Sequence, residues 1–171
     1  MCGIFGISNK INPEEDYNKI IEDLKYLVSL SESRGSDTFG VSIKTAEENL
    51  LFKTSERPTR AVKSKSFKNF FEEKLKNNLT DKLMLIGQTR LVTNGSKFSY
   101  QNNQPLETKN LIGVHNGIFT NLTNYSENKT INYESYDVKS DSLTFFENAS
   151  KLANEDNFFY NFFDFLKQIV G

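Results

Sequence analysis

The sequence predicts an α+β protein in which helices cover stacked sheets. Three observations support this fold class. Strand-like apolar segments dominate the first two thirds of the chain, amphipathic helical patterns lie between them, and two further helical patterns follow. Each helix has a single apolar stripe and therefore needs a sheet or another helix to cover it. At 171 residues the chain suits one domain that buries roughly 70% of its unfolded surface.

The first two elements have the clearest signals. Residues 2–8 are apolar and interrupted by glycine, which predicts a buried strand with Cys2 at its tip. A helix follows, because Asn12 can cap it, Pro13 suits its first position, and acidic residues come next. A turn at 33–37 ends it. The helix has one apolar stripe, made of Tyr17, Ile20, Ile21, Leu24, Leu27 and Val28.

Four later segments predict strands: 39–44, 50–54, 83–89 and 111–115. The first two form a pair joined by a charged loop, and the last two are continuous apolar runs typical of strands covered on both faces. An amphipathic helix is expected over 67–77. After Asp141 two helical patterns follow, and the second, from Phe158 to Val170, needs an apolar partner.

Charge and composition exclude several function classes. The 21 basic and 22 acidic residues give a net charge of -1, which provides no field to attract nucleic acid or an anionic membrane. One cysteine and one histidine cannot build a four-ligand zinc site. No run could span a membrane, and the start lacks a signal-peptide pattern. We therefore expect a cytoplasmic protein with no cofactor, no metal, no nucleic-acid partner and no membrane partner.

Cys2 is the first candidate for chemistry. If an aminopeptidase removes Met1, Cys2 gains a free α-amino group beside its thiol. Groups of both kinds titrate within about a unit or two of neutral pH, so one residue would supply a nucleophile and a base. The alternative is a buried strand cysteine without a chemical role, which the general burial of cysteine favours when position 2 is considered alone.

A second candidate site follows the expected strand at 83–89. Arg90 offers a planar fork that pairs with a carboxylate through two hydrogen bonds, and Thr93 and Asn94 place neutral hydrogen-bonding groups beside it. These residues are suited to hold a carboxylate. The alternative is an exposed arginine in an ordinary loop.

Two further motifs admit two interpretations each. In His115-Asn116-Gly117 the glycine permits a sharp turn, so the Asn116 amide and the Gly117 N–H can point together at a developing negative oxygen. A simple chain-reversing turn is the alternative. Asp141 could complement a helix dipole or bind a substrate ammonium. With Arg90 it would then recognise both charged groups of an amino acid.

Six segments, taken in order, make the chain resemble the class II glutamine amidotransferases, which are N-terminal-nucleophile hydrolases. The segments are MCGIFG at 1–6, SRGSDTFG at 33–40, GQTRLVTNG at 87–95, NNQPL at 102–106, HNGIFTN at 115–121 and SDS at 140–142. The resemblance spans positions 1 to about 142. It implies an αββα sandwich of two mainly antiparallel sheets.

The resemblance also implies roles for the matched residues. Those expected to act at the reacting amide are Cys2, Asn116, Gly117 and Arg34. Those expected to bind the amino-acid end of L-glutamine are Arg90, Thr93, Asn94 and Asp141. In the first group Cys2 is the nucleophile and its freed amine is the base, directly or through a water, whereas Arg34 has only a supporting role.

The implied reaction is hydrolysis of L-glutamine. The Cys2 thiolate attacks the side-chain amide, ammonia leaves, and water hydrolyses the γ-glutamyl thioester to L-glutamate. In this family an acceptor or synthase domain or subunit uses the ammonia to make an amino sugar, phosphoribosylamine or asparagine. Leu91 and Asn94 depart from the amino-sugar branch, which has an aromatic residue and a histidine there, so the acceptor stays open.

We expect residues 1–171 to form one glutaminase domain without the further strands usual in the family and without an acceptor domain. Two other functions stay open. One is an amidotransferase-like module that binds an amino acid or a partner without turnover. The other is a thiol hydrolase that uses a Cys2–His115 dyad.

Overall fold

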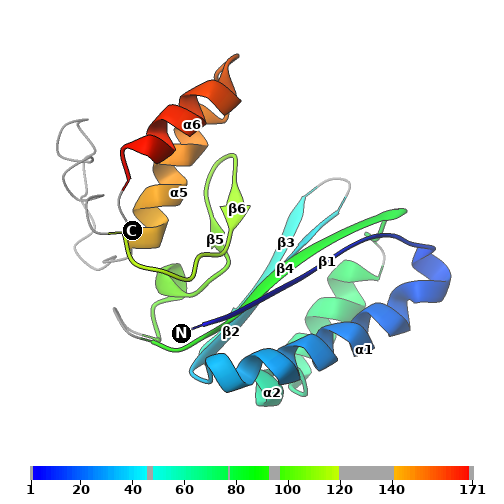
Figure 1. The fold of residues 1–171 in the computed structure, drawn as a ribbon. Helices are drawn as coiled ribbons and strands as arrows, with labels where there is room; N and C mark the ends of the chain where they lie inside the picture. Colours follow the sequence, from blue (N-terminus) through cyan, green and yellow to red (C-terminus); the bar gives the residue numbers. More distant parts are fainter. Residues whose placement is uncertain (1, 46–47, 77, 93–96, 120–140, 170–171) are drawn as a thin grey trace.

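The structure is a computed structural model that describes residues 2–45, 48–76, 78–92, 97–119 and 141–169. These residues form an α+β fold with two antiparallel sheets. Helices α1 and α2 lie on one side of the larger sheet, and the smaller sheet with helices α5 and α6 lies on the other (Figure 1). The predicted class, helices over stacked sheets, is confirmed.

The larger sheet, sheet A, has four strands in the order β1-β4-β2-β3, and every neighbouring pair is antiparallel. Its strands are β1 (Gly3–Lys10), β2 (Thr38–Lys44), β3 (Asn49–Thr54) and β4 (Lys82–Arg90). Gly3 pairs with Thr89 of β4, and Thr38 pairs with Arg90. This register brings Cys2, the end of β4 and the start of β2 to one end of the sheet.

One face of sheet A is covered by helix α1 (Pro13–Ser31), whose buried residues are Ile20, Leu24 and Val28. The side chain of Asn12 accepts a hydrogen bond from the Glu14 N–H, so the predicted cap is present. The 3-10 helix η1 (Glu32–Arg34) follows directly. The helix therefore leads the chain from the core of the domain to the end of the sheet where Cys2 lies.

Shorter helices complete this covering layer: α2 (Pro58–Ala61), α3 (Lys65–Asn69) and the π-helical segment η2 (Phe70–Leu75). The helix expected over 67–77 begins earlier because Ser64 caps it, accepting from the Phe67 N–H at 3.2 Å. Phe39, Phe67 and Phe71 are almost fully buried in the layer between these helices and the sheet. Burial of each such side chain contributes about 1.5–3 kcal/mol.

Among the described residues, the opposite face of sheet A is covered near the end where Cys2 lies and is open further along (Figure 1). Along β4, Leu83 and Leu85 are buried under the helices, whereas Met84 is 58% exposed on the other face. Gln88, near the end of the strand, is fully buried. The prediction that residues 83–89 are covered on both faces is therefore wrong for the first half of the strand.

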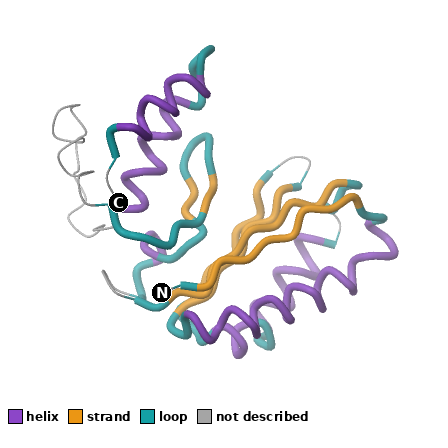
Figure 2. The backbone as a smooth tube through the Cα atoms, viewed as in Figure 1, coloured by secondary structure: helices purple, strands orange, loops and turns teal. Residues whose placement is uncertain are grey.

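The second layer begins with the 3-10 helix η3 (Tyr100–Asn102) and a small sheet of β5 (Leu106–Glu107) and β6 (Ile112–Gly113). The apolar run at 111–115 thus forms a strand of only two residues. The backbone N–H and carbonyl of His115 bond instead to glutamine side chains, which ends the strand pairing. Figure 2 shows this short hairpin between the loops and the two later helices.

Helices α5 (Asp141–Leu152) and α6 (Phe158–Lys167) pack on each other through a second apolar cluster. Phe145 of α5 stacks on Phe165 of α6 with ring centroids 5.6 Å apart. The apolar partner expected for the last helix is therefore α5, although Phe159 and Phe163 on its outer side stay 85% and 61% exposed. None of the described helices is long and apolar enough to cross a membrane.

Candidate active site

Cys2 lies directly before β1, half-buried, and side chains from two distant segments hold its backbone. Its N–H donates to Asn116 Oδ1 at 3.1 Å, and its carbonyl accepts from Asn116 Nδ2 at 3.1 Å and from Arg34 Nε at 3.2 Å. The thiol lies 3.8 Å from the Leu91 carbonyl oxygen. The backbone is therefore anchored by side-chain bonds, while the sulfur makes only this weak contact with the described part of the chain.

Asn116 and Gly117 follow β6 and reach Cys2 from the second layer. One hydrogen of Asn116 Nδ2 bonds to the Cys2 carbonyl, and the amide group carries a second hydrogen. Gly117 is exposed, and a Cβ at this position would lie 2.7 Å from His115 Nε2, so a side chain does not fit without movement. The Gly117 N–H makes no hydrogen bond with the described part of the chain. Asn116 thus places one N–H donor at the backbone of Cys2, and the N–H of Gly117 comes next in the chain.

Arg34 reaches Cys2 from η1 because the turn that carries it packs tightly on the end of β4. A Cβ on Gly35 would lie 2.5 Å from the Thr89 carbonyl oxygen, closer than any side chain permits. The Thr89 hydroxyl in turn donates to the Ser31 carbonyl at 2.7 Å. Glycine at 35 therefore sets how closely this turn approaches the strand, and with it the position of Arg34.

Arg90 ends β4 close to Cys2. Its Nη1 donates to Asn103 Oδ1 at 3.1 Å. Burial lowers the pKa of Arg90, and the negative charges of Cys2 and Asp37 oppose that shift. Because an arginine titrates far above neutral pH, the guanidinium stays charged. A half-buried cation beside the thiol is suited to hold an anionic group of a substrate.

Asp141 is the first residue of α5, and its carboxylate joins this helix to the segment after Gly117. Its Oδ2 accepts from the Phe119 N–H at 2.7 Å, and its Oδ1 accepts from the Ser142 N–H at 2.7 Å. Within the described residues Asp141 makes no hydrogen bond with Cys2. Its carboxylate instead contacts the backbone of Phe119, three residues after Asn116. Two predicted site residues, Thr93 and Asn94, lie outside the described residues.

The chain is similar to part of an enzyme whose name includes glutamine. Over 124 residues it is 36% identical to the glutamine–fructose-6-phosphate aminotransferase (isomerizing) of Helicobacter pylori strain J99. The matched segment is 71% of this chain and 17% of that enzyme, so the chain spans about a sixth of the length of the relative. No family model matches the chain.

This similarity agrees with the resemblance seen in the motifs and supports a glutamine amidotransferase domain of the kind found in that enzyme. Of the residues that the motifs assigned to the reacting amide, Arg34 and Asn116 bond to the backbone of Cys2, and Gly117 follows Asn116 in the chain. Arg90 lies beside them, as its electrostatic interaction with Cys2 indicates.

Two buried glutamines that the motifs left without a role hold the segment before Asn116. Gln104 Oε1 accepts from the His115 N–H at 2.5 Å, and the Nε2 atoms of Gln104 and Gln88 donate to the His115 carbonyl at 3.0 and 2.8 Å. Gln88 Nε2 also donates to Gln104 Oε1. We call this arrangement the amide clamp. Both residues occur in the matching segments at 87–95 and 102–106, which is the only sequence signal for them.

Asp37 and Asn103 were also not assigned a role from the sequence. Asp37 Oδ2 accepts from the Val92 N–H at 2.8 Å, and its backbone N–H donates to the Arg90 carbonyl at 2.9 Å. Asn103 accepts from Arg90. The contacts of Asp37 fix the path of the backbone after β4, and the contact of Asn103 orients the Arg90 guanidinium.

The His115 ring contacts residues other than Cys2. Its Nδ1 shares a hydrogen bond with the Ser142 hydroxyl at 2.8 Å, and the ring stacks on Phe119 with centroids 4.2 Å apart. Burial lowers the pKa of His115, and the charge of Asp141 opposes that shift. Within the described residues, no hydrogen bond joins His115 to the Cys2 thiol, so this geometry gives the Cys2–His115 dyad no support.

The described residues contain no group of three or more histidine, cysteine, aspartate or glutamate side chains that could hold a metal ion. The polar groups that surround Cys2 are instead amides and guanidinium groups.

Proposed function

We propose that this chain is the glutaminase domain of a class II glutamine amidotransferase, with Cys2 as the nucleophile once Met1 has been removed. The observation that carries the proposal is the convergence of Arg34 and Asn116, 32 and 114 positions away, on the backbone of Cys2. The similarity to an aminotransferase named for glutamine supports L-glutamine as the substrate.

Arg90 is proposed to bind the α-carboxylate of L-glutamine. Support comes from its partial burial and from its place at the end of β4 near Cys2, where a guanidinium can pair with a carboxylate. Asp141 is proposed to bind the α-ammonium, with Thr93 and Asn94 as neighbouring contacts. The carboxylate of Asp141 already holds the segment that follows Gly117, so it would link ammonium binding to the placement of the two N–H donors.

The proposed chemistry begins when the freed amine of Cys2 takes the proton of the thiol. Sγ then bonds to the side-chain carbonyl carbon of glutamine, and an electron pair moves to the amide oxygen. Asn116 Nδ2 and the Gly117 N–H donate to this oxyanion. Asn116 Oδ1 accepts the N–H of Cys2 and would hold the amine in place once Met1 has been removed.

The proton on the amine next passes to the departing nitrogen, the carbon–nitrogen bond breaks, and ammonia leaves. Water, deprotonated by the same amine, attacks the γ-glutamyl thioester and releases L-glutamate with the thiol restored. We propose that an acceptor domain or subunit then uses the ammonia. Fructose 6-phosphate, which is part of the name of the similar enzyme, is the first acceptor to test. A free thiol nucleophile needs a reducing compartment, which favours the cytoplasm.

The test is release of L-glutamate by protein whose loss of Met1 has been verified by mass spectrometry. We expect Cys2→Ser and Cys2→Ala to lose at least ~10³-fold of the activity. A glutamine-like diazo-ketone should add once to Cys2 and to no other residue. His115→Gln should retain a measurable part of the activity because the amine, and not the imidazole, is the base.

Three outcomes would contradict the proposal. Activity in protein that retains Met1 would exclude the amine as base. Unchanged activity in Cys2→Ser would exclude the nucleophile. Binding of glutamine without glutamate release in the processed protein would instead identify an amidotransferase-like binding module.

A further inference from the structure

Lys53 of β3 connects sheet A to the second layer at a place outside the candidate active site. Its neighbour Phe52 packs on Phe39 and Phe67 under the helices, so the side chain of Lys53 leaves the strand on the opposite face. Lys53 Nζ donates to the Tyr100 carbonyl at 3.4 Å and lies 4.6 Å from the centroid of the Tyr100 ring. The last strand in the order of sheet A thus contacts η3 through a cation.

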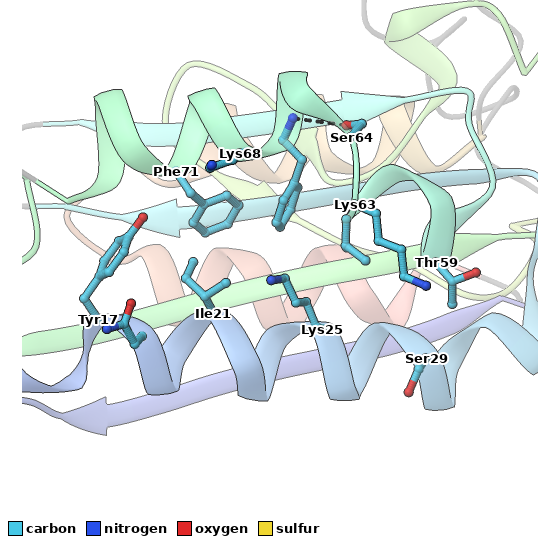
Figure 3. A pocket seen from close by; sticks show the side chains of 12 residues that line it. Tyr17, Ile21, Lys25, Ser29, Thr59, Lys63, Ser64, Lys68 and Phe71 are labelled. Carbon is cyan, nitrogen blue, oxygen red and sulfur yellow. Dashed lines mark hydrogen bonds between the residues drawn. The ribbon is translucent and has the colours of Figure 1, made fainter.

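The ammonium group of Lys53 is partly enclosed where the two layers meet. Lys53 pairs with Gly40 of β2, and a Cβ on Gly40 would lie 2.0 Å from the Gln104 carbonyl oxygen, so the second layer touches the sheet directly beside Lys53. Burial lowers the pKa of Lys53 to about 8, with the charge of Glu107 opposing, as expected for an amine held between layers. The groove shown in Figure 3 lies instead among the helices, and Lys53 does not line it.

The Tyr100 carbonyl joins Lys53 to the residue that orients Arg90. The same oxygen accepts the backbone N–H of Asn103 at 3.3 Å, which closes the turn of η3. Asn103 Nδ2 donates to the Lys97 carbonyl at 2.8 Å, and Asn103 Oδ1 accepts from Arg90 Nη1 at 3.1 Å. Two further hydrogen bonds therefore connect the contact of Lys53 with the guanidinium of Arg90.

The rings of this segment contribute little buried area to its anchoring. Phe98 and Tyr100 are 76% and 56% exposed. The position of η3 therefore depends strongly on polar contacts, and the bond from Lys53 is one that sheet A supplies.

We propose that Lys53 is a positioning residue for substrate binding. By holding the Tyr100 carbonyl it keeps Asn103 where it directs the Arg90 guanidinium. The inference rests on the proposed binding of the α-carboxylate of L-glutamine by Arg90. Because that carboxylate does not react, its contact has the same strength in the ground state and in the transition state. Loosening the contact should therefore raise KM and leave kcat unchanged.

The first experiment compares the kinetics of Lys53→Met with those of wild type in the full chain freed of Met1. Methionine keeps an apolar stem of similar length but removes the donor and the charge. We expect KM for L-glutamine to rise about 3- to 10-fold and kcat to stay within about 2-fold, as for one weakened hydrogen bond. Lys53→Arg, which restores a cation with donors, should return KM to within about 2-fold of wild type.

Two controls separate positioning from damage to the fold. Lys44→Met, at the exposed end of β2, should keep the wild-type KM. Lys53→Met should unfold at or above the wild-type temperature at pH 7, because methionine buries no charge. A fall in kcat equal to the rise in KM, or a rise in KM that follows a lower unfolding temperature, would assign the effect to the fold and overturn the inference.

The second experiment asks whether Lys53 acts through Arg90. Arg90→Gln should lower kcat/KM for L-glutamine, and adding Lys53→Met to this variant should lower it by less than about 2-fold more. Losses that multiply in the double variant would show that Lys53 acts independently of Arg90, and would overturn the inference.

Failure of this inference is distinguishable from failure of the proposed function. Calorimetric titration with L-glutamate measures the same carboxylate contact even in a chain that does not hydrolyse L-glutamine, and Lys53→Met should weaken this binding by the same factor as it raises KM. If Arg90→Gln weakens binding and Lys53→Met does not, this inference alone is wrong. If neither variant weakens binding, the proposed role of Arg90 is wrong and the inference falls with it.

Discussion

The side-chain amide of Asn116 bonds to both backbone groups of Cys2, accepting from its N–H and donating to its carbonyl, each at 3.1 Å. A carboxamide is suited to this pairing because it carries an acceptor and a donor side by side. The first bond holds the nitrogen that would serve as base, and the second holds Nδ2 at the Cys2 carbonyl. A single residue thus links the position of the base to that of the oxyanion donors.

Asn116→Asp tests this pairing. The substitution keeps the shape and the acceptor but removes the donor, and it places a negative charge where the oxyanion would form. We expect kcat for glutamine hydrolysis to fall by about 10²–10³, the usual loss for one such donor. Kinetics should be compared with thermal unfolding of the same preparation. Activity within about 3-fold of wild type would show that Asn116 only anchors the chain.

Gln104→Leu removes one side of the amide clamp. The His115 N–H loses its acceptor and the carbonyl loses one of two donors, so we expect a loss of about 1–3 kcal/mol in the free energy of unfolding and a lower kcat. Urea unfolding and glutamate release measure the two effects. Gln101→Leu, at an exposed position nearby, is the control and should change neither. Equal effects of Gln104→Leu and Gln101→Leu on stability and kcat would contradict the role assigned to the amide clamp.

Gly40→Ala should be destabilising through overpacking. A Cβ at this position would lie 2.0 Å from the Gln104 carbonyl oxygen and 3.0 Å from the Pro105 ring. We expect a loss of about 1–3 kcal/mol in stability, because the 104–105 segment must move away from the sheet. Gly6→Ala, where the nearest atom would be 3.0 Å away, should cost less. Thermal unfolding of both variants gives the comparison, and the reverse order would contradict it.

Glu32 should make stability depend on pH in the acid range. Its burial raises the pKa, but hydrogen bonds from Thr59 and Arg57 outweigh this, so the net pKa lies below the usual value of 4.5. A carboxyl with a lowered pKa stabilises the fold at pH values above 4.5, and this stabilisation is lost as the pH falls through the folded-state pKa. Glu32→Gln should therefore lose ~1 kcal/mol at neutral pH and show a weaker acid dependence. Glu56→Gln, at an exposed position, should match wild type, and a steeper acid transition in Glu32→Gln would refute the prediction.

Lys53 should make stability depend on pH in the alkaline range, where stability should again rise with pH. Burial lowers its pKa from 10.5 to about 8, with the charge of Glu107 opposing. Between these two values the unfolded chain binds more protons, so stability should rise from pH 8 towards pH 10.5. Lys53→Met should remove the rise, as measured by urea unfolding across this range. Lys44→Met, on the exposed end of the neighbouring strand, should keep it. If the increase in stability persists in Lys53→Met, another group causes it and the prediction is wrong.

The larger elements could be predicted because their patterns are local. The cap at Asn12, the stripe on α1 and the strand pair β2–β3 follow from spacing alone, and all are present. The two-residue strands β5 and β6 could not be predicted, since their pairing depends on side chains of Gln88 and Gln104 that bond to His115. A local sequence pattern does not indicate contacts between residues this far apart in the chain.

For the candidate site, the motifs indicated which residues belong to it but not which hydrogen bonds they form. The bond between Asn116 and Cys2 depends on the register of β1 against β4 and on the docking of the second layer. Arg34 was expected only near the nucleophile, and its bond to the Cys2 carbonyl results from the close approach of Gly35 to β4. Contacts of this kind join residues far apart in the chain, and a single sequence does not specify them.

The order of sheet A affects events during synthesis. Strand β1 is at one edge and pairs with β4 alone among the described strands, so β1 has no strand partner until residues 82–90 have been synthesised. At about 5–20 residues per second, translation of the intervening ~80 residues takes about 4–16 s. For that time β1 stays unpaired, and the proposed removal of Met1 would precede the pairing of β1 with β4.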